Sequence, residues 1–321
     1  MRKRLLSILL TLCMVFSLLP QMAMAQEIPI GYSYGGDVGS SGLDLTQAPS
    51  NTYYKAGDGY ILWNDTDNDT DTLTLNNATI DTTTGNAFAL TLKRNENVTI
   101  VAEGTNVLVS NTDGIGQASG GDGGDRADTV IKGSGTLAVT SEDTAPFGCS
   151  AISLNGALTI SGGVTVTPIN NKNSQNSLST RGGISIMENA SLGFTENTPT
   201  GEIKLNTGGD ITVDTTGKVD VSYMFINGKF IHTNGKLADL WVTEDIGSDY
   251  CVCTVYNNYT LKQNETIIDR NGEDGLTVPN GATLTINEGV TLTVEDDDNN
   301  EIPTITNLGT IINNGTIQFP V

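Results

Sequence analysis

Residues 276–294 read LTVPNGATLTINEGVTLTV and contain the repeat that decides the fold. Three short apolar triplets, at 276–278, 284–286 and 292–294, begin eight residues apart, and each has a central Thr. Successive side chains of a strand point to opposite faces, so the two aliphatic residues of each triplet share the inner face. The segments between them carry Pro, Asn and Gly, which favour tight turns and leave no room for a helix. The pattern predicts short strands joined by corners.

The same pattern recurs along most of the chain with two spacings. Triplets start eight residues apart at Ile203, Ile211 and Val219, and six residues apart at Leu158 and Val164. Three strands at the longer spacing make a coil of about 24 residues, which lies within the period range of solenoid proteins. We therefore expect an all-β chain folded as a right-handed parallel β-helix.

An antiparallel β-sandwich is the alternative fold. Asn-Gly dipeptides such as Asn155-Gly156 and Asn280-Gly281 are a signal for β-hairpins. Most apolar runs, however, have only three residues, whereas strands usually have about five or six. In a solenoid such a short strand is sufficient, because it pairs with the coils on both sides.

Residues 1–25 have the organisation of a secretory signal peptide. Arg2, Lys3 and Arg4 precede a long apolar segment, and Ala23-Met24-Ala25 supplies the small residues of a cleavage site. No later segment has about 18 consecutive apolar residues, so we expect no membrane insertion after cleavage. We expect a secreted, extracellular protein, either released or held at the cell surface by a protein partner that the sequence does not identify.

The charge balance argues against two classes of partner. The chain has 37 acidic and 16 basic residues, with a formal net charge of −21 at pH 7. Nucleic acids and anionic membranes are bound through Lys and Arg, so neither is expected here. Calcium is compatible with this composition, because it prefers oxygen ligands.

The longest glycine-rich segment, 116–128 (GQASGGDGGDRAD), contains the candidate calcium site. Glycine lets the backbone turn sharply, so the carboxylates of Asp122, Asp125 and Asp128 can converge on one cation. The alternative is a mobile loop that leaves the coil. No other cofactor is expected.

A second acidic segment extends from Asp65 to Asp71, where carboxylates alternate with polar residues. The helix-loop-helix calcium motif requires Gly and Glu at its sixth and twelfth positions, where this chain has Thr70 and Asn76. The segment therefore favours a solvated acidic turn over a weak calcium site.

Three cysteines follow the signal peptide: Cys149, Cys251 and Cys253. We interpret them as thiols packed like small apolar side chains. The alternative is a zinc site completed by His232, the only histidine. Paired zinc cysteines are usually separated by two to four residues, whereas one residue separates Cys251 from Cys253.

The regularity of the repeat divides the chain. The spacing breaks between residues 230 and 259, where Trp241, Tyr256 and Tyr259 gather near two of the cysteines. We expect a signal peptide at 1–25, an N-terminal leader and cap at 26–62, the main β-helix at 63–229, an irregular segment or hairpin joint at 230–259, and C-terminal coils at 260–321.

Five segments of the main repeat carry a family resemblance: 73–78 (LTLNNA), 98–100 (VTI), 103–106 (EGTN), 131–139 (IKGSGTLAV) and 158–166 (LTISGGVTV). In these segments the chain resembles the carbohydrate-binding β-helix proteins of bacterial surfaces, over roughly residues 65–197. The resemblance implies a parallel β-helix that binds polysaccharide, and the family includes binders of acidic polysaccharides. Its calcium-holding Asp-Gly-Ile turn is matched once, at Asp113-Gly114-Ile115.

Pectin-degrading enzymes also use β-helices, so catalysis has to be weighed. Asn111-Thr112-Asp113 matches the first element of the polygalacturonase signature, but its Asp-Asp and Gly-His-Gly elements are missing. A glycoside hydrolase needs two carboxyls at a set separation, and the polygalacturonase motif that would supply them on a β-helix is incomplete here. We therefore expect a secreted or cell-surface polysaccharide-binding protein without catalytic activity. The alternative is an adhesin or structural spacer of the bacterial surface.

Overall fold

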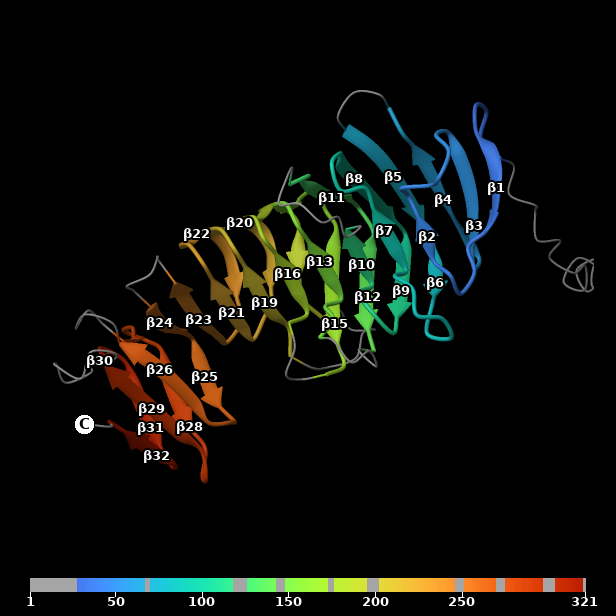
Figure 1. Ribbon diagram of the computed structural model, residues 1–321. Coiled ribbons are helices and arrows are strands. Elements are labelled where there is room, and N and C mark those ends of the chain that lie inside the picture. Colours follow the sequence, from blue (N-terminus) through green and yellow to red (C-terminus); the bar gives the residue numbers. More distant parts are fainter. Residues whose placement is uncertain are drawn as a thin grey trace, which may run out of the picture.

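The computed structural model describes residues 28–66, 70–117, 126–142, 148–172, 176–194, 202–245, 251–269, 275–296 and 304–319. Within these residues the chain is all β, and its strands stack in about eight turns of a parallel solenoid (Figure 1). The predicted parallel β-helix is confirmed, and the parallel pairing excludes the antiparallel sandwich. The described part of the chain contains no helix long and apolar enough to cross a membrane.

The main solenoid has three strand columns. One column consists of β5 (Thr70–Asn76), β8 (Asn97–Glu103), β11 (Thr129–Gly133), β14 (Leu158–Ile160), β17 (Ile184–Glu188), β20 (Ile211–Val219) and β22 (Phe230–Leu237). The second consists of β6 (Thr79–Asp81), β9 (Thr105–Ser110), β12 (Thr136–Ser141), β15 (Thr165–Asn170) and β18 (Ser191–Leu192), and it joins the first through β20. The third consists of β2 (Leu43–Asp44), β7 (Leu90–Leu92), β10 (Ile115–Gln117), β13 (Ile152–Leu154), β16 (Leu178–Thr180), β19 (Lys204–Thr207), β21 (Tyr223–Ile226) and β23 (Leu240–Asp245).

The strand register explains why the triplets repeat. Equivalent inward residues stack directly upon one another, as in the fully buried series Leu73, Ile100, Ile131, Ile160, Ile186 and Val213. The central residues of the triplets, such as Thr159 and Ser185, point outward and stay partly exposed. Burial of aliphatic columns is the main driving force for the coil, since each buried side chain contributes about 1.5 to 3 kcal/mol.

The corners need special backbone and side-chain chemistry. Gly162 and Gly289 turn two equivalent corners with φ angles of 72° and 76°, a region that favours glycine. At another corner the fully buried Asn106 links three coils: its Oδ1 accepts from the Ala78 amide at 2.9 Å, and its Nδ2 donates to the Thr136 carbonyl at 3.1 Å. Buried backbone groups are thereby satisfied where the strands end.

An antiparallel meander covers the N-terminal end of the main solenoid. β3 (Thr52–Ala56), β4 (Gly59–Asn64) and β5 pair antiparallel, and β1 (Ser33–Asp37) pairs parallel with β3 at the outer edge. The fully buried Trp63 of β4 lies in the core of the main solenoid. The meander therefore shields the first coil, which has no coil before it to pair with.

A hairpin of β23 and β24 (Cys251–Tyr256) ends the main solenoid and begins the C-terminal one. These two strands are antiparallel, whereas β24, β27 (Leu276–Val278) and β30 (Ile305–Asn307) are again parallel to one another. The C-terminal solenoid is completed by β25 (Asn258–Leu261), β28 (Thr283–Ile286) and β31 (Thr310–Asn313) in one sheet and by β26 (Glu265–Asp269), β29 (Thr291–Asp296) and β32 (Thr316–Gln318) in another.

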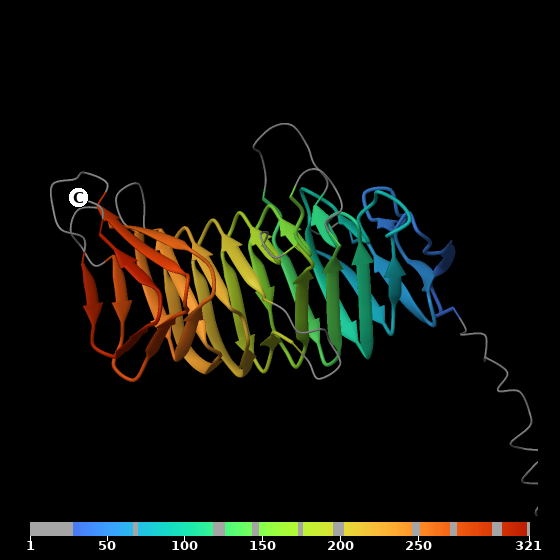
Figure 2. The same cartoon turned by 90° about the horizontal axis from the view of Figure 1, so that it is seen from below.

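The two solenoids have separate cores on opposite faces of β23. Leu240 and Val242 belong to the main core, whereas Trp241, which points the other way, belongs to the C-terminal core with Cys253 and Val255. The outer face of the main solenoid thus becomes the inner face of the C-terminal one. Reversing both the strand direction and the face that carries the core leaves the winding sense unchanged, so the coils continue along the same direction (Figure 2).

Candidate functional site

A groove with a volume of about 430 Å³ lies at the meeting of the two solenoids, and we call it the joint groove. One wall is the outer face of the main solenoid, where Lys204, Tyr223 and Trp241 are direct neighbours on β19, β21 and β23. The volume falls within the range of ligand-binding pockets, which are typically about 300 to 1,000 Å³.

The opposite wall belongs to the first coil of the C-terminal solenoid. Tyr259 and Leu261 come from β25, Glu265 begins β26, and Lys262 and Gln263 lie between these strands. The groove therefore combines aromatic rings with carboxyl, amide and ammonium groups. Such a mixture of apolar surface and a few polar groups is typical of small-molecule and sugar-sized sites.

Two residues of this wall occupy positions that the later coils use for their core. Tyr259 pairs with Leu284, and Glu265 pairs with Leu292, and both leucines are fully buried. In the first coil, a phenol and a carboxyl thus replace leucines. A carboxyl at a core position lowers stability, and such departures from the repeat are expected at functional sites. The groove is the open end of the C-terminal core, and Tyr259 and Glu265 face it.

The aromatic side chains of the groove are held in place by one threonine and by one another. The Trp241 Nε1 donates to Thr243 Oγ1 at 3.2 Å, and the Tyr223 hydroxyl lies 3.3 Å from the same oxygen. The ring centroids of Trp241 and Tyr259 are 5.5 Å apart. Trp241 is only 1% exposed, so Tyr223 and Tyr259, which are half-buried, present the accessible aromatic surface.

Among the described residues, the charged groups that line the groove are two lysines and two glutamates. Both lysines approach one carboxylate: Lys204 Nζ lies 3.6 Å from Glu202 Oε2, and Lys262 Nζ lies 3.7 Å from Glu202 Oε1. Burial raises the pKa of Glu265, and the attraction of Lys204 offsets this only in part. Burial also raises the pKa of Tyr259, and the nearby Glu202 and Glu265 carboxylates add to the increase.

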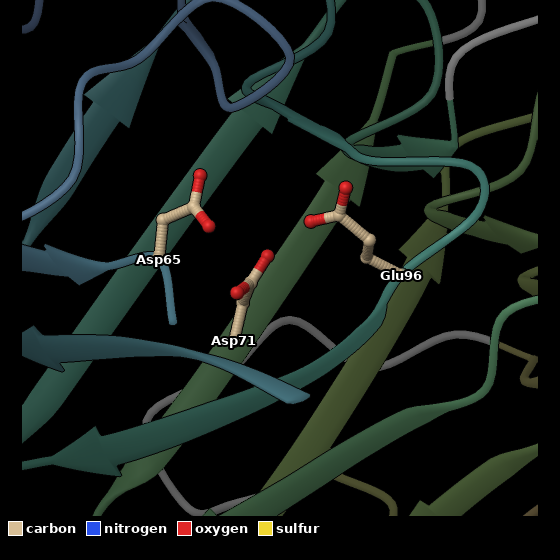
Figure 3. Close-up of side chains that lie close together, drawn as sticks. All are labelled: Asp65, Asp71 and Glu96. Carbon is tan, nitrogen blue, oxygen red and sulfur yellow. The ribbon is translucent and has the colours of Figure 1, made fainter. Parts of the chain in front are cut away.

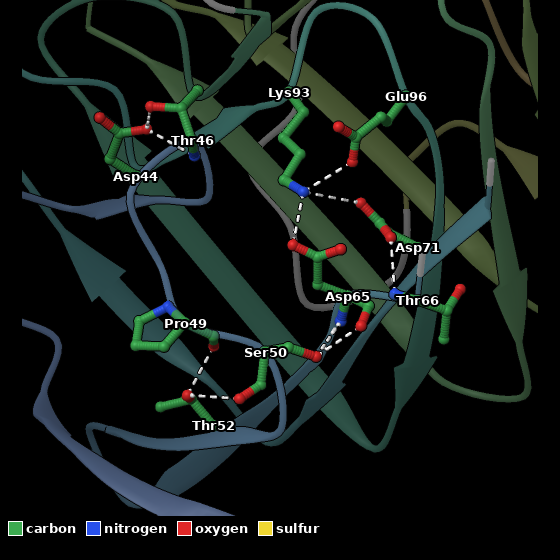
Figure 4. A network of polar contacts seen from close by, with 10 residues as sticks. All are labelled: Asp44, Thr46, Pro49, Ser50, Thr52, Asp65, Thr66, Asp71, Lys93 and Glu96. Carbon is green, nitrogen blue, oxygen red and sulfur yellow. Dashed lines mark hydrogen bonds and ion pairs between the residues drawn. The ribbon is translucent and has the colours of Figure 1, made fainter. Parts of the chain in front are cut away.

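A second cluster of ionisable groups lies at the opposite end of the molecule. The carboxylate oxygens of Asp65, Asp71 and Glu96 are all within 4.8 Å of one another, and the three side chains point toward a common centre (Figure 3). Lys93 fills that centre: its Nζ lies 2.6 Å from Asp65, 2.6 Å from Glu96 and 3.3 Å from Asp71 (Figure 4). The protein's own ammonium group stands where a cation would bind, so we interpret the cluster as a structural ion network.

Asp71 is the buried member of this network. It occupies an inward position of β5, in register with Val98, and is 1% exposed. Its Oδ1 accepts from the Thr66 amide at 3.0 Å, and its Oδ2 forms the ion pair with Lys93 Nζ at 3.3 Å. Burial and the neighbouring Glu96 raise the pKa of Asp71 to about 6, against the lowering effect of Thr66 and Lys93.

The calcium residues expected from the sequence are only partly visible. Asp122 and Asp125 lie outside the described residues. Asp128 is exposed at a coil corner, where its Oδ1 accepts from the Ala157 amide at 2.8 Å and its own amide donates to Asn97 Oδ1 at 2.7 Å. One oxygen of Asp128 therefore links neighbouring coils. The calcium site stays a prediction.

The cysteines and the histidine are distributed over different environments. Cys253 is 3% exposed in the C-terminal core, as expected for a packed thiol, and Cys149 is half-buried. His232 is exposed on β22, with its ring stacked against Phe230 at 6.3 Å. Within the part of the chain that the structure describes, the one group of possible metal ligands is Asp65, Asp71 and Glu96, which contains no cysteine and no histidine.

Comparison of the chain with protein-family models, curated proteins and solved structures found no match. The sequence did place Trp241 and Tyr259 in an irregular joint, but not Tyr223, Glu202 or Glu265 in a groove. Two signals could have located it. Trp241 is a large aromatic residue at the centre of a Leu-Trp-Val triplet, in register with Tyr223, and Glu265 stands where the repeat requires an aliphatic residue.

Proposed function

We propose that this chain is an exported polysaccharide-binding protein and that the joint groove binds a short segment of the sugar chain. The observation that carries the proposal is the replacement of two core leucine positions by Tyr259 and Glu265, which face a groove with Tyr223. Sugar rings have an apolar face of C–H groups and a rim of hydroxyls. Aromatic rings can cover the former, and carboxyl and amide groups can hydrogen-bond the latter.

The resemblance to carbohydrate-binding β-helix proteins of bacterial surfaces supports the same proposal. It concerns the repeat of the main solenoid, whereas the groove lies at the end of that repeat. The two arguments are therefore independent of each other.

The test is retention of the purified full chain on a panel of immobilised polysaccharides, with Tyr223→Ala and Phe225→Ala compared. Both residues are half-buried and point outward from β21, but only Tyr223 lines the groove. We expect retention on at least one polymer and an affinity about tenfold weaker for Tyr223→Ala, since a lost aromatic contact is worth about 1.4 kcal/mol. Thermal unfolding of both variants measures any damage to the fold.

Retention on no polymer would remove the carbohydrate proposal and favour an adhesin or spacer, whose contacts would be with proteins. Equal loss for the two variants would place the sugar elsewhere on the solenoid. Glu202 and Glu265 both line the groove, and two carboxyls are the minimum for glycoside hydrolysis. The same samples should therefore be assayed for released reducing sugar. We expect none; its appearance would make the protein an enzyme.

A further inference from the structure

We propose that the joint groove selects a neutral polysaccharide and that the carboxylate of Glu265 disfavours polymers of uronic acids. This inference rests on the proposed function and names the class of sugar that the groove takes. It differs from the expectation raised by the family resemblance, which includes acidic polysaccharides.

The first argument concerns the lysines, which are the groups that would bind an acidic sugar. Lys204 and Lys262 each approach a different oxygen of Glu202, at 3.6 and 3.7 Å. Glu202 therefore presents one oxygen to each ammonium group, and the Glu265 carboxylate is the second negative charge in the groove that balances the two lysines. A uronate would have to displace Glu202 from one of them, and the displaced carboxylate would remain beside the ligand.

The second argument concerns Glu265. This carboxyl faces the groove from a position in register with Leu292, so it is fixed by the sheet rather than extended on a mobile loop. Its two oxygens can accept hydrogen bonds from sugar hydroxyls, and bonds to a charged acceptor are stronger than neutral ones. The same carboxylate repels a uronate at close range.

The third argument is the net charge of the molecule. With a formal charge of −21, the chain repels a polyanion within a Debye length of its surface, about 8 to 10 Å at physiological salt, whereas an uncharged polymer is unaffected. Burial raises the pKa of Glu265, and the same loss of hydration would apply to a uronate carboxylate that entered the groove.

The experiment measures binding of the full chain to soluble neutral polysaccharides (a β-glucan, a xyloglucan and a mannan) and to polygalacturonate and alginate. EDTA is present throughout, so that calcium cannot bridge an acidic polymer to the protein. Glu265→Gln is compared with the wild type, because glutamine keeps hydrogen-bonding capacity and removes the charge. Glu288→Gln is the matched control: it makes the same change of net charge at an exposed turn outside the groove.

We expect a neutral polymer to bind at least about tenfold more tightly than either acidic one, as juxtaposed like charges oppose binding. Glu265→Gln should strengthen binding of the acidic polymers by about tenfold and change neutral binding by less than about threefold. Glu288→Gln should change neither by more than about twofold.

Tighter binding of an acidic than of a neutral polymer in EDTA would overturn this inference and leave the proposed function intact. Equal effects of Glu265→Gln and Glu288→Gln would overturn it as well, because they would show that Glu265 does not face the bound sugar. Binding to no polymer of either kind is the separate result that removes the proposed function itself.

Discussion

Each of the two solenoids has a carboxyl at a core position of its first coil, but the two carboxyls differ in burial and in ion pairing. Asp71 in the main solenoid is in register with Val98, and Glu265 in the C-terminal solenoid is in register with Leu292. Asp71 is 1% exposed and has Lys93 as its counterion, whereas Glu265 is half-buried beside the joint groove. The comparison shows that Asp71 is paired with a lysine inside the protein, whereas Glu265 is left partly exposed to solvent at the groove.

The largest effect should come from breaking the boundary between the two regions. Trp241→Ala removes the fully buried ring that anchors the C-terminal core to β23, and we expect a loss of about 3 to 5 kcal/mol. Hydrogen exchange should show lost protection in strands β24 to β32, with strands β5 to β20 retaining theirs, because the cores are separate. A uniform loss of protection in both regions would contradict the two-core description.

The second change tests the carboxyl that is paired with a lysine. Lys93→Met leaves Asp71 buried without its counterion, and we expect a loss of about 3 kcal/mol in the free energy of unfolding, measured by chemical denaturation. The double variant Lys93→Met/Asp71→Val replaces the pair with apolar side chains. It should regain most of this loss, since Val98 occupies the same column. A double variant as unstable as Lys93→Met would show that Asp71 is not the cause.

The third prediction is the pH dependence of the same carboxyl. The pKa of Asp71 is about 6 in the folded protein against an ordinary value of 3.8, so the folded state binds its proton more tightly than the unfolded state. The stabilisation from protonation is complete below pH 4 and is lost as the pH rises through 6. Relative to Asp71→Asn, the wild type should therefore gain about 1 to 3 kcal/mol between pH 7 and pH 4. Parallel pH profiles of the two proteins would count against a raised pKa.

The smallest change concerns the carboxyl at the groove. Glu265→Leu restores the residue type that the repeat uses at Leu292, and we expect a gain of about 1 kcal/mol together with loss of polysaccharide binding. Denaturation and polymer retention measure the two effects on the same preparation. A destabilised Glu265→Leu variant would mean that the carboxyl supports the fold, and the contrast with Asp71 would then disappear.

The coil itself could be predicted because it depends on a local pattern. Triplets such as 284–286 and 292–294 carry the period of the strands and the spacing of the turns, and the structure stacks them in register. The triplet pattern recurs in successive coils, so the sequence indicates the same strand and turn many times. Parallel pairing was inferred from the short apolar runs, because a strand of a solenoid pairs with the coils on both sides.

The joint groove could not be predicted because it depends on which face of β23 carries the core. The sequence marks an irregular segment around Trp241, but it does not say that the hairpin transfers the core to the opposite face. Glu202 and Glu265 are 63 residues apart and approach one groove only after that transfer. The sequence favoured a solvated acidic turn at 65–71, which is wrong for Asp71, because Asp71 is buried and Lys93 reaches it from the corner between β7 and β8.

Because the core changes sides at β23, the length of the main solenoid can vary without any change in the residues that line the joint groove. Each parallel coil adds about 4.8 Å along the stack, the spacing between neighbouring strands. Whole coils inserted among β8 to β17 would move the groove farther from the N-terminal meander in equal steps, without altering a residue that lines it. The number of coils in the main solenoid thus sets the distance between that meander and the joint groove.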